Sequence, residues 1–276
     1  MPVPTEPAFG AASAPTSATH RSIVLDQFTR QAELFAKAPA LHSQAALDLL
    51  VDTASPRGHE ASLDVACGPG TVVAAFARRL RWAAGLDATS AMLQQARELA
   101  AEQGLENVEW HQGDVYALPF PDGAFDIVSC RFAFHHLQEP RRAFAEMLRV
   151  CRPGGRIVLC DATVSDDPAK AAAFNAMERH RDPSTVAFRP LGFLLALFER
   201  AGLANPGLAY YQVPAERERL IAASFPAGDD RERLRQMIDE SVDGDRMGVN
   251  ACWDGGTVKF QYPAVILVAT KPTSPY

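Results

Sequence analysis

The sequence has few aromatic residues and no long apolar run. Aromatic side chains make up 8% of its 276 residues, and no stretch approaches the roughly 20 apolar residues that a helix needs to cross a bilayer. We therefore expect no stable insertion into a membrane. Residues 1–19 lack both the basic start and the apolar core of a secretory signal, and their Pro, Ala, Ser and Thr content predicts a disordered tail.

Cysteines are also few, and none of them forms a C-x-x-C pair. The chain has five, at positions 67, 130, 151, 160 and 252. Cys67, Cys130 and Cys160 lie in or beside apolar runs that predict core strands. The pattern indicates small buried side chains in a reducing compartment, so we expect a cytoplasmic protein without disulfides.

The sequence also has no excess of basic residues. The formal net charge is −6, with 27 Lys and Arg against 33 Asp and Glu. A protein that binds a nucleic-acid backbone would need a basic face, so the composition argues against such a partner. Hydrophobic residues make up 47% of the chain, which is enough for a sizeable core in one large domain, or in a domain with an elaboration.

The stretch Leu63–Thr71 organises the chain. It predicts a buried strand, a turn containing Gly68 and Gly70, and then a helix over 72–80. Glycines let the backbone turn sharply and approach a ligand, and the helix that follows points free N–H groups into the same crevice. The dinucleotide fingerprint requires a third glycine, where this chain has Val73. The turn therefore favours a nucleoside ligand without a pyrophosphate.

Three carboxylates stand at the ends of successive predicted strands. Asp64 comes just before the glycine turn, and Asp87 closes the apolar run that begins at Trp82. A carboxylate at the second of these positions can accept hydrogen bonds from both ribose hydroxyls. Asp114 ends the third run, where it could accept from an adenine amino group. The three positions predict a site for an adenosine derivative.

Five motifs occur in order along the chain. They are D-V-A-C-G-P-G (64–70), D-A-T-S-A-M-L (87–93), G-D-V-Y-A-L-P-F (113–120), F-D-I-V-S-C-R-F-A-F-H-H-L (125–137) and R-P-G-G-R-I-V-L (152–159). With them the chain resembles class I S-adenosylmethionine (SAM)-dependent methyltransferases, and within these the branch of ubiquinone and menaquinone C-methyltransferases and many small-molecule methyltransferases. The resemblance runs from about Phe28 to Ala269.

The resemblance implies an α/β fold, a three-layer Rossmann-like sandwich. Its sheet would have seven strands, mostly parallel, with an antiparallel last strand. The strands are expected at 62–67, 82–86, 108–111, 125–130, 156–160, 208–213 and 262–270. The alternation of strands and helices independently predicts a parallel sheet with right-handed crossovers.

The expected organisation has three parts. Residues 1–19 form the tail, 20–60 form N-terminal helices that cover the cofactor, and 61–276 form the SAM-binding domain. About 45 residues separate the last two predicted strands, where the family has a short hairpin. We therefore expect a helical insertion at about 214–258, with helices over 215–224 and 229–241, folded over the substrate mouth.

The resemblance implies SAM as cofactor and S-adenosyl-L-homocysteine (SAH) as product. Asp64 and the Gly68–Gly70 backbone should face the methionine end, Asp87 the ribose, and Met92 and Asp114 the adenine. The residues expected against the cofactor are Phe28, Phe35, Asp64, Ala66, Gly68, Gly70, Asp87, Ala88, Met92, Gly113, Asp114, Val115 and Arg131.

Candidate catalytic residues are histidines. The methyl group of SAM is already activated, so the protein mainly positions the reactants and excludes water. A hydroxyl or acidic carbon acceptor must also lose a proton, which histidine can take at neutral pH. His135 and His136 follow the fourth predicted strand, and His20 could approach from the N-terminal helix. No third ligand accompanies the histidine pair, so no metal site is predicted.

The expected function is methyl transfer from SAM to a small-molecule acceptor, with O- or C-methylation favoured. A homodimer is compatible with these features. One alternative is a SAM-binding isomerase, cyclase or regulator, and another is an oxidoreductase with a nucleotide cofactor. A nucleic-acid methyltransferase is opposed by the acidic balance. It is also opposed by Arg131-Phe132-Ala133-Phe134, which stands where base amino-methyltransferases have Asn/Asp-Pro-Pro-Tyr.

Overall fold

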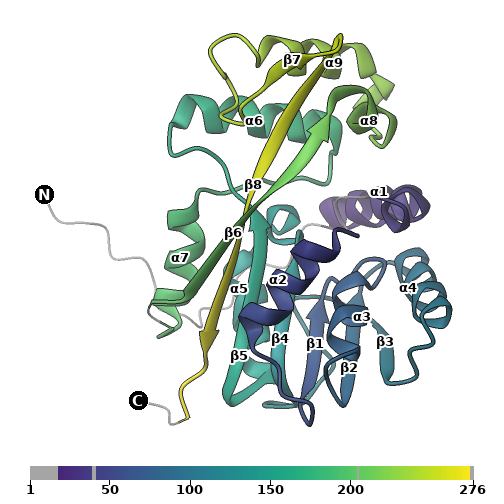
Figure 1. The fold of residues 1–276 in the computed structure, drawn as a ribbon, viewed down its shortest axis with the longest axis vertical. Helices are drawn as coiled ribbons and strands as arrows, with labels where there is room; N and C mark the ends of the chain where they lie inside the picture. Colours follow the sequence, from purple (N-terminus) through teal and green to yellow (C-terminus); the bar gives the residue numbers. More distant parts are fainter. Residues whose placement is uncertain (1–17, 39–41, 204, 274–276) are drawn as a thin grey trace, which may run out of the picture.

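The computed structural model describes residues 18–38, 42–203 and 205–273, and a mixed β-sheet forms its centre (Figure 1). The strand order is β3-β2-β1-β4-β5-β8-β6. The strands are β1 (Ala61–Val65), β2 (Trp82–Asp87), β3 (Val108–Gln112), β4 (Phe125–Arg131), β5 (Cys151–Ala162), β6 (Gly207–Glu216) and β8 (Thr257–Thr270). The pairs among β1–β5 are parallel, whereas β8 is antiparallel to β5 and β6. The expected Rossmann-like sheet with an antiparallel last strand is confirmed.

Helices cover both faces of this sheet, which makes the three layers. On one face α2 (Gln44–Ala54), α3 (Thr71–Ala77) and α4 (Ser90–Glu102) enclose one apolar cluster. On the other face α5 (Pro140–Val150) and α7 (Leu191–Arg200) enclose a second. All five residues of β1 are buried, because both faces of the strand are covered.

A third apolar cluster lies beyond the end of the sheet. It is formed by α6 (Pro168–Arg181), α8 (Arg217–Ala222), α9 (Arg231–Glu240) and the extended ends of β6 and β8. The short strand β7 (Cys252–Asp254) pairs with β8 on this unit. Figure 1 shows β8 running without a break from the central sheet into the unit.

The late strands are longer than the sequence pattern indicated. β6 continues to Glu216 and β8 starts at Thr257, because residues 214–216 pair with 259–261 as a two-stranded ribbon beyond the sheet. The helix expected over 215–224 is therefore confined to α8, and the one over 229–241 to α9. The predicted insertion is only partly helical, since it also contains β7 and the ends of the ribbon.

The R-P-G-G segment is part of β5 rather than a turn before it. The pairing register between β4 and β5 shifts here, between Phe125 and Ile127. Gly154 has a φ of +75°, and its N–H donates to the carbonyl of Lys271 at 2.8 Å. The glycine therefore makes an irregularity inside the strand, a conformation that other residues rarely adopt.

The N-terminal helix α1 (Ala18–Ala36) packs against α4. It starts two residues before the expected helix, and the rest of the predicted tail, residues 1–17, lies outside the described residues. Cys67, Cys130, Cys151 and Cys160 are buried thiols, and Cys252 is exposed. None of the helices in the described ranges is long and apolar enough to span a bilayer.

Candidate functional site

A cavity of about 280 Å³ lies between α1 and the carboxyl ends of β1, β2 and β4. The strand order reverses between β1 and β4, and open parallel sheets bind ligands at such a point. The predicted site residues that line the cavity are His20, Phe28, Phe35, Asp64, Ala66, Gly68, Asp87, Ala88, Met92, Asp114, Val115, Arg131 and His136. His135, Gly70 and Gly113 are not among its lining residues.

The two glycines of the turn have different roles. Gly68 has a φ of +52°, and no atom lies within 4 Å of the position that a Cβ would take. A ligand can therefore approach its backbone. A Cβ on Gly70 would lie 2.6 Å from the Trp110 ring and 2.9 Å from the Cβ of Ala96. Gly70 is thus required by packing, and it does not line the cavity.

Gly113 is also a packing residue. A Cβ at this position would lie 2.7 Å from Cδ1 of Leu86, a core side chain of β2. Its N–H donates to the carbonyl of Asp87 at 3.0 Å. Because Gly113 has no side chain, the backbone can pass close to β2. The next residue, Asp114, then lines the cavity.

Two residues at the strand tips have left-handed backbone angles. Ala66 follows β1 with a φ of 56°, and Phe132 follows β4 with a φ of 54°. Both line the cavity. Such angles cost non-glycine residues about 1–3 kcal/mol each and are concentrated at functional sites. Apart from the motifs themselves, nothing in the residue types indicated these two conformations.

Asp64 lies at the end of β1 as a buried carboxyl group. It is 2% exposed, and Ser129 Oγ donates to its Oδ1 at 2.7 Å. Burial raises the pKa of Asp64 to about 7, although the Ser129 hydrogen bond and the Arg131 charge act in the opposite direction. A cationic group bound beside it would favour the ionised carboxylate.

Asp87 connects the glycine turn to the start of α4. Its Oδ2 accepts the N–H of Gly68 and its Oδ1 the N–H of Thr89, both at 2.9 Å. Burial raises the pKa of this carboxyl as well, against the effect of these hydrogen bonds. Asp87 also lines the cavity, so its oxygens can accept hydrogen bonds from ligand hydroxyls. The two carboxylates, together with the open backbone of Gly68, fit the cationic adenosyl group of SAM.

The far end of the cavity is bounded by Met92 and Asp114. Met92 is 1% exposed and presents an apolar side chain from α4. Asp114 Oδ1 accepts the N–H of Tyr116 at 2.9 Å, and its Oδ2 pairs with Arg21 of α1 at 3.4 Å. Arg21 was not a predicted site residue, and its ion pair links α1 to the opposite wall.

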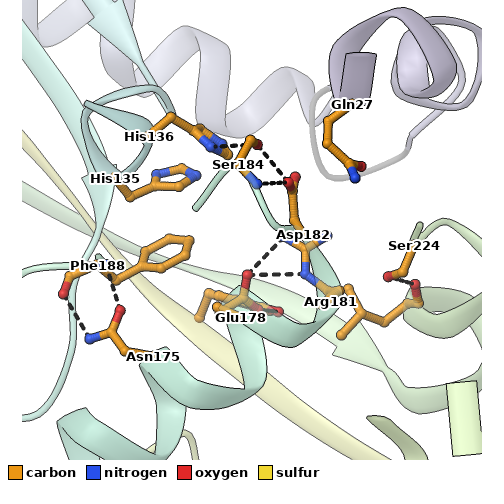
Figure 2. Close-up of polar contacts among 12 residues, drawn as sticks. Gln27, His135, His136, Asn175, Glu178, Arg181, Asp182, Ser184, Phe188 and Ser224 are labelled. Atoms are coloured by element: carbon orange, nitrogen blue, oxygen red, sulfur yellow. Dashed lines mark hydrogen bonds and ion pairs between the residues drawn. The ribbon is translucent and has the colours of Figure 1, made fainter. Parts of the chain in front are cut away.

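His135 lies behind the cavity wall. It belongs to the short 3-10 helix η1 (Phe134–His136), and its Nδ1 contacts Oδ1 of Asp161 at 2.8 Å. Its N–H donates to the other oxygen of the same carboxylate at 3.1 Å. The ring stacks on Phe188, with centroids 3.9 Å apart (Figure 2). These contacts make His135 a packed side chain, so of the pair only His136 reaches the cavity.

His136 is 8% exposed and lines the cavity. Its Nδ1 lies 3.0 Å from Ser184 Oγ, and the ring of Phe28 contacts it edge-on with centroids 4.9 Å apart. Burial, reinforced by the neighbouring His135, lowers the pKa of His136 to about 3. The imidazole is therefore neutral at pH 7, as a proton acceptor must be.

α1 contributes more to the site than the sequence indicated. His20 Nε2–H donates to the carbonyl of His136 at 2.9 Å, which fixes the start of the helix over the cavity. Val24 and Leu25 also line it. The helical spacing from His20 through Val24 to Phe28 was a signal that could have identified them. Further lining residues that were not predicted include Tyr116, Leu137 and Arg142.

Residues 214–258 do not line the cavity, as far as the structure describes them. They pack on α6, and the carbonyl of Phe225 accepts from Gln27 of α1 at 3.2 Å. The expected position over the substrate mouth is thus replaced by contact with the helix that covers the cavity. Within the described residues no group of three or more His, Cys, Asp or Glu could hold a metal ion.

Known proteins resemble this chain over most of its length. A methyltransferase domain matches residues 63–159. The uncharacterised methyltransferase YcgJ of Bacillus subtilis (strain 168) is 30% identical over 246 residues, which are 88% of this chain and 97% of YcgJ. The crystal structure of YcgJ gives a TM-score of 0.74 over 83% of this chain and 99% of its own.

Two further relatives match different shares of the chain. The crystal structure of BH2331 from Bacillus halodurans C-125 is 28% identical, with a TM-score of 0.76 over 83% of this chain and 100% of that one. The ubiquinone/menaquinone biosynthesis C-methyltransferase UbiE of Roseobacter denitrificans is 33% identical over 131 residues. This match covers 46% of this chain and 52% of UbiE.

Proposed function

Because the chain belongs to the SAM-dependent methyltransferases, we propose that it methylates a small molecule on oxygen or carbon, in the cavity beneath α1. The observation that carries this proposal is the position of α1. The helix covers the cavity with Val24, Leu25 and Phe28, and its His20 is hydrogen-bonded to the wall. A largely apolar cavity beneath a helix suits a small acceptor better than an exposed loop of a macromolecule.

The carboxylates of the cavity hold the cofactor. Bound SAM supplies a methyl group that its sulfonium has already activated. Asp64 stabilises positive charge when it is ionised, and Asp87 accepts from ligand hydroxyls while keeping the Gly68 loop in place. These residues orient the ligand, and α1 keeps water away from it, so positioning contributes most of the rate enhancement.

His136 takes the proton of the acceptor. As the new bond forms, an acceptor hydroxyl becomes strongly acidic, and its O–H bond breaks toward Nε2 of the neutral imidazole. A base whose pKa lies far below 7 can accept the proton at that stage, although it cannot deprotonate the acceptor beforehand. His136 thus assists the transfer without carrying positive charge in the resting protein.

The proposal is tested by measuring SAH release with a panel of phenols and hydroxyquinones. We expect His136→Gln to lower kcat by about 100- to 10,000-fold and to leave the Kd of SAM unchanged. His111→Gln is the matched control, because His111 does not line the cavity. Unchanged kcat in His136→Gln would remove the base. SAM binding without SAH release across the panel would favour the isomerase, cyclase or regulator.

A further inference from the structure

Ser184 and Asp182, outside the cavity, form a chain of hydrogen bonds behind His136 (Figure 2). Ser184 Oγ lies 3.0 Å from Nδ1 of His136 and 2.5 Å from Oδ1 of Asp182. The Ser184 N–H donates to the same oxygen at 2.9 Å. Ser184 is 0% exposed and Asp182 is 1% exposed, so water does not compete for these contacts.

The carboxylate of Asp182 is held in its ionised form. Its oxygens accept hydrogen bonds from the hydroxyl and the N–H of Ser184 and from the amide of Gln31. Burial raises the pKa of this carboxyl, but the charge that His136 carries when protonated, the charge of Arg181 and these hydrogen bonds outweigh that effect, and the net shift is downward. An ionised carboxylate carries no hydrogen and can only accept. The hydroxyl hydrogen of Ser184 therefore points to Asp182.

The direction of this hydrogen bond determines the tautomer of His136. A serine hydroxyl has one hydrogen, which Asp182 already accepts, so Ser184 Oγ can only accept from the imidazole. Nδ1 must then carry the ring hydrogen, and Nε2 keeps its lone pair. Free histidine prefers the opposite tautomer, with the hydrogen on Nε2, which could not accept a proton from a substrate.

We propose that Ser184 and Asp182 are positioning residues that hold His136 in the Nδ1–H tautomer and so direct the Nε2 lone pair to the methyl acceptor. The inference rests on the proposed function, in which His136 is the base. After proton transfer Nδ1–H still donates to Ser184, and the imidazolium charge is offset by Asp182 through the serine hydroxyl. We call Ser184 and Asp182 the relay. The relay thus stabilises both protonation states of the His136 ring.

The relay also reaches the helix over the cavity. Gln31 of α1 is 0% exposed, and its Nε2 donates to Oδ2 of Asp182 and to Oε1 of Gln27, both at 3.2 Å. When α1 is packed in this position, its Gln31 donates one of the hydrogen bonds that Asp182 accepts. The same helix that closes the cavity completes the support of the base, so the relay is fully assembled only when the site is closed.

The tautomer can be measured without knowing the acceptor. Two-bond ¹⁵N–¹H correlation spectra of the full-length protein labelled with ¹⁵N-histidine distinguish the two forms, and His136→Gln assigns the signals. We expect the wild-type protein to show His136 with hydrogen on Nδ1 at pH 7. A wild-type spectrum with hydrogen on Nε2 would overturn the relay whatever the variants do.

Substitutions separate the relay from general packing. Ser184→Ala should shift His136 toward the Nε2–H tautomer and lower kcat by about 10- to 100-fold, less than the loss of the base itself, without changing the Kd of SAM. Thr185→Val is the matched control, because Thr185 Oγ1 is a neighbouring buried hydroxyl with no partner in the described residues. Equal effects of both variants would contradict the relay. If the expected tautomer is found but no SAH is released, the proposed function is contradicted and the relay is not.

Discussion

At the scale of single residues, Asp64 lies where ionisation costs free energy in the ligand-free protein. Burial raises its folded pKa to about 7, whereas the pKa of an unfolded Asp is about 3.8. Between these two values the folded state binds more protons than the unfolded state. Stability therefore falls as pH rises from about 4 to 7, and the loss is complete above the folded pKa.

Asp64→Asn should make the protein more stable and bind SAM more weakly. At pH 8 the gain in unfolding free energy is expected to be roughly 2–4 kcal/mol, because the buried charge is gone. Affinity for SAM should fall because no carboxylate faces its cation. Denaturant unfolding and calorimetry measure the two effects.

The matched control for this substitution is Asp126, which lies near the amino end of β4. Its pKa is lowered, because the N–H of Ala61 and the Arg152 guanidinium outweigh the effect of burial. Its contribution to stability is present above the unfolded pKa and is lost in acid, so Asp126→Asn should destabilise the protein at pH 8. An Asp64→Asn variant that is less stable than wild type would contradict the assignment.

Single residues could be predicted where residue type alone carries the signal. The carboxylates at the tips of β1 and β2 were identified because aspartate ends an apolar run. The distinct roles of His135 and His136 were hidden, because they depend on which ring packs against Phe188. Ser184 lies 48 positions along the chain from the histidine that it supports. Only the tertiary fold brings such partners together.

At the scale of elements, α1 is held to the protein in an unusual way. Of its 19 residues the buried ones are Gln27, Gln31 and Ala32. By contrast α2, with 11 residues, buries Ala46, Leu47, Leu50, Val51 and Ala54. Burial of apolar area stabilises a docked helix by about 25 cal/mol per Å², whereas an internal hydrogen bond largely replaces one to water. We therefore expect α1 to be held to the protein more weakly than α2.

Hydrogen exchange should show this difference. In the protein without ligand, the amides of α1 are expected to exchange faster than the central amides of α2, because local opening of α1 exposes little apolar surface. SAH should slow exchange in α1 and leave α2 nearly unchanged, since α1 residues line the cavity. An α1 that is already as protected as α2, or that does not respond to SAH, would show that it is a fixed part of the fold.

Elements could be predicted from the sequence where periodicity is local. The alternation of strands and helices identified β1 to β5. Of these, β1, β2 and β4 are buried along almost their whole length and contain apolar runs, whereas β3 is an edge strand without a fully buried residue. The ends of β6 and β8 were missed because the ribbon beyond the sheet has an exposed side. There β8 alternates buried Val258 and Phe260 with exposed Lys259 and Gln261, a weaker signal than the apolar run that follows.

At the scale of the whole molecule, β8 links the three apolar clusters. Val265 and Leu267 belong to the cluster under α5 and α7, and Ile266 to the one under α2 and α3. Earlier in the same strand, Val258 and Phe260 belong to the cluster under α6 and α9. A strand shared in this way cannot lose its pairing at one end without weakening the other, so the late unit should unfold together with the sheet.

This coupling can be tested by making a cavity in the late unit. Ile238 of α9 is 0% exposed, and Ile238→Ala should cost about 2–5 kcal/mol through lost burial and the space left behind. Scanning calorimetry should show one transition at a lower Tm, as for Leu197→Ala, which removes a similar side chain from the cluster under α7. The Kd of SAH at 25 °C should stay unchanged, because no described residue between 214 and 258 lines the cavity. Two outcomes would contradict this coupling or the position of the late unit. A separate early transition in Ile238→Ala would show that the late unit is an independent domain. Weaker SAH binding by fully folded Ile238→Ala protein would show that the late unit shapes the cofactor site.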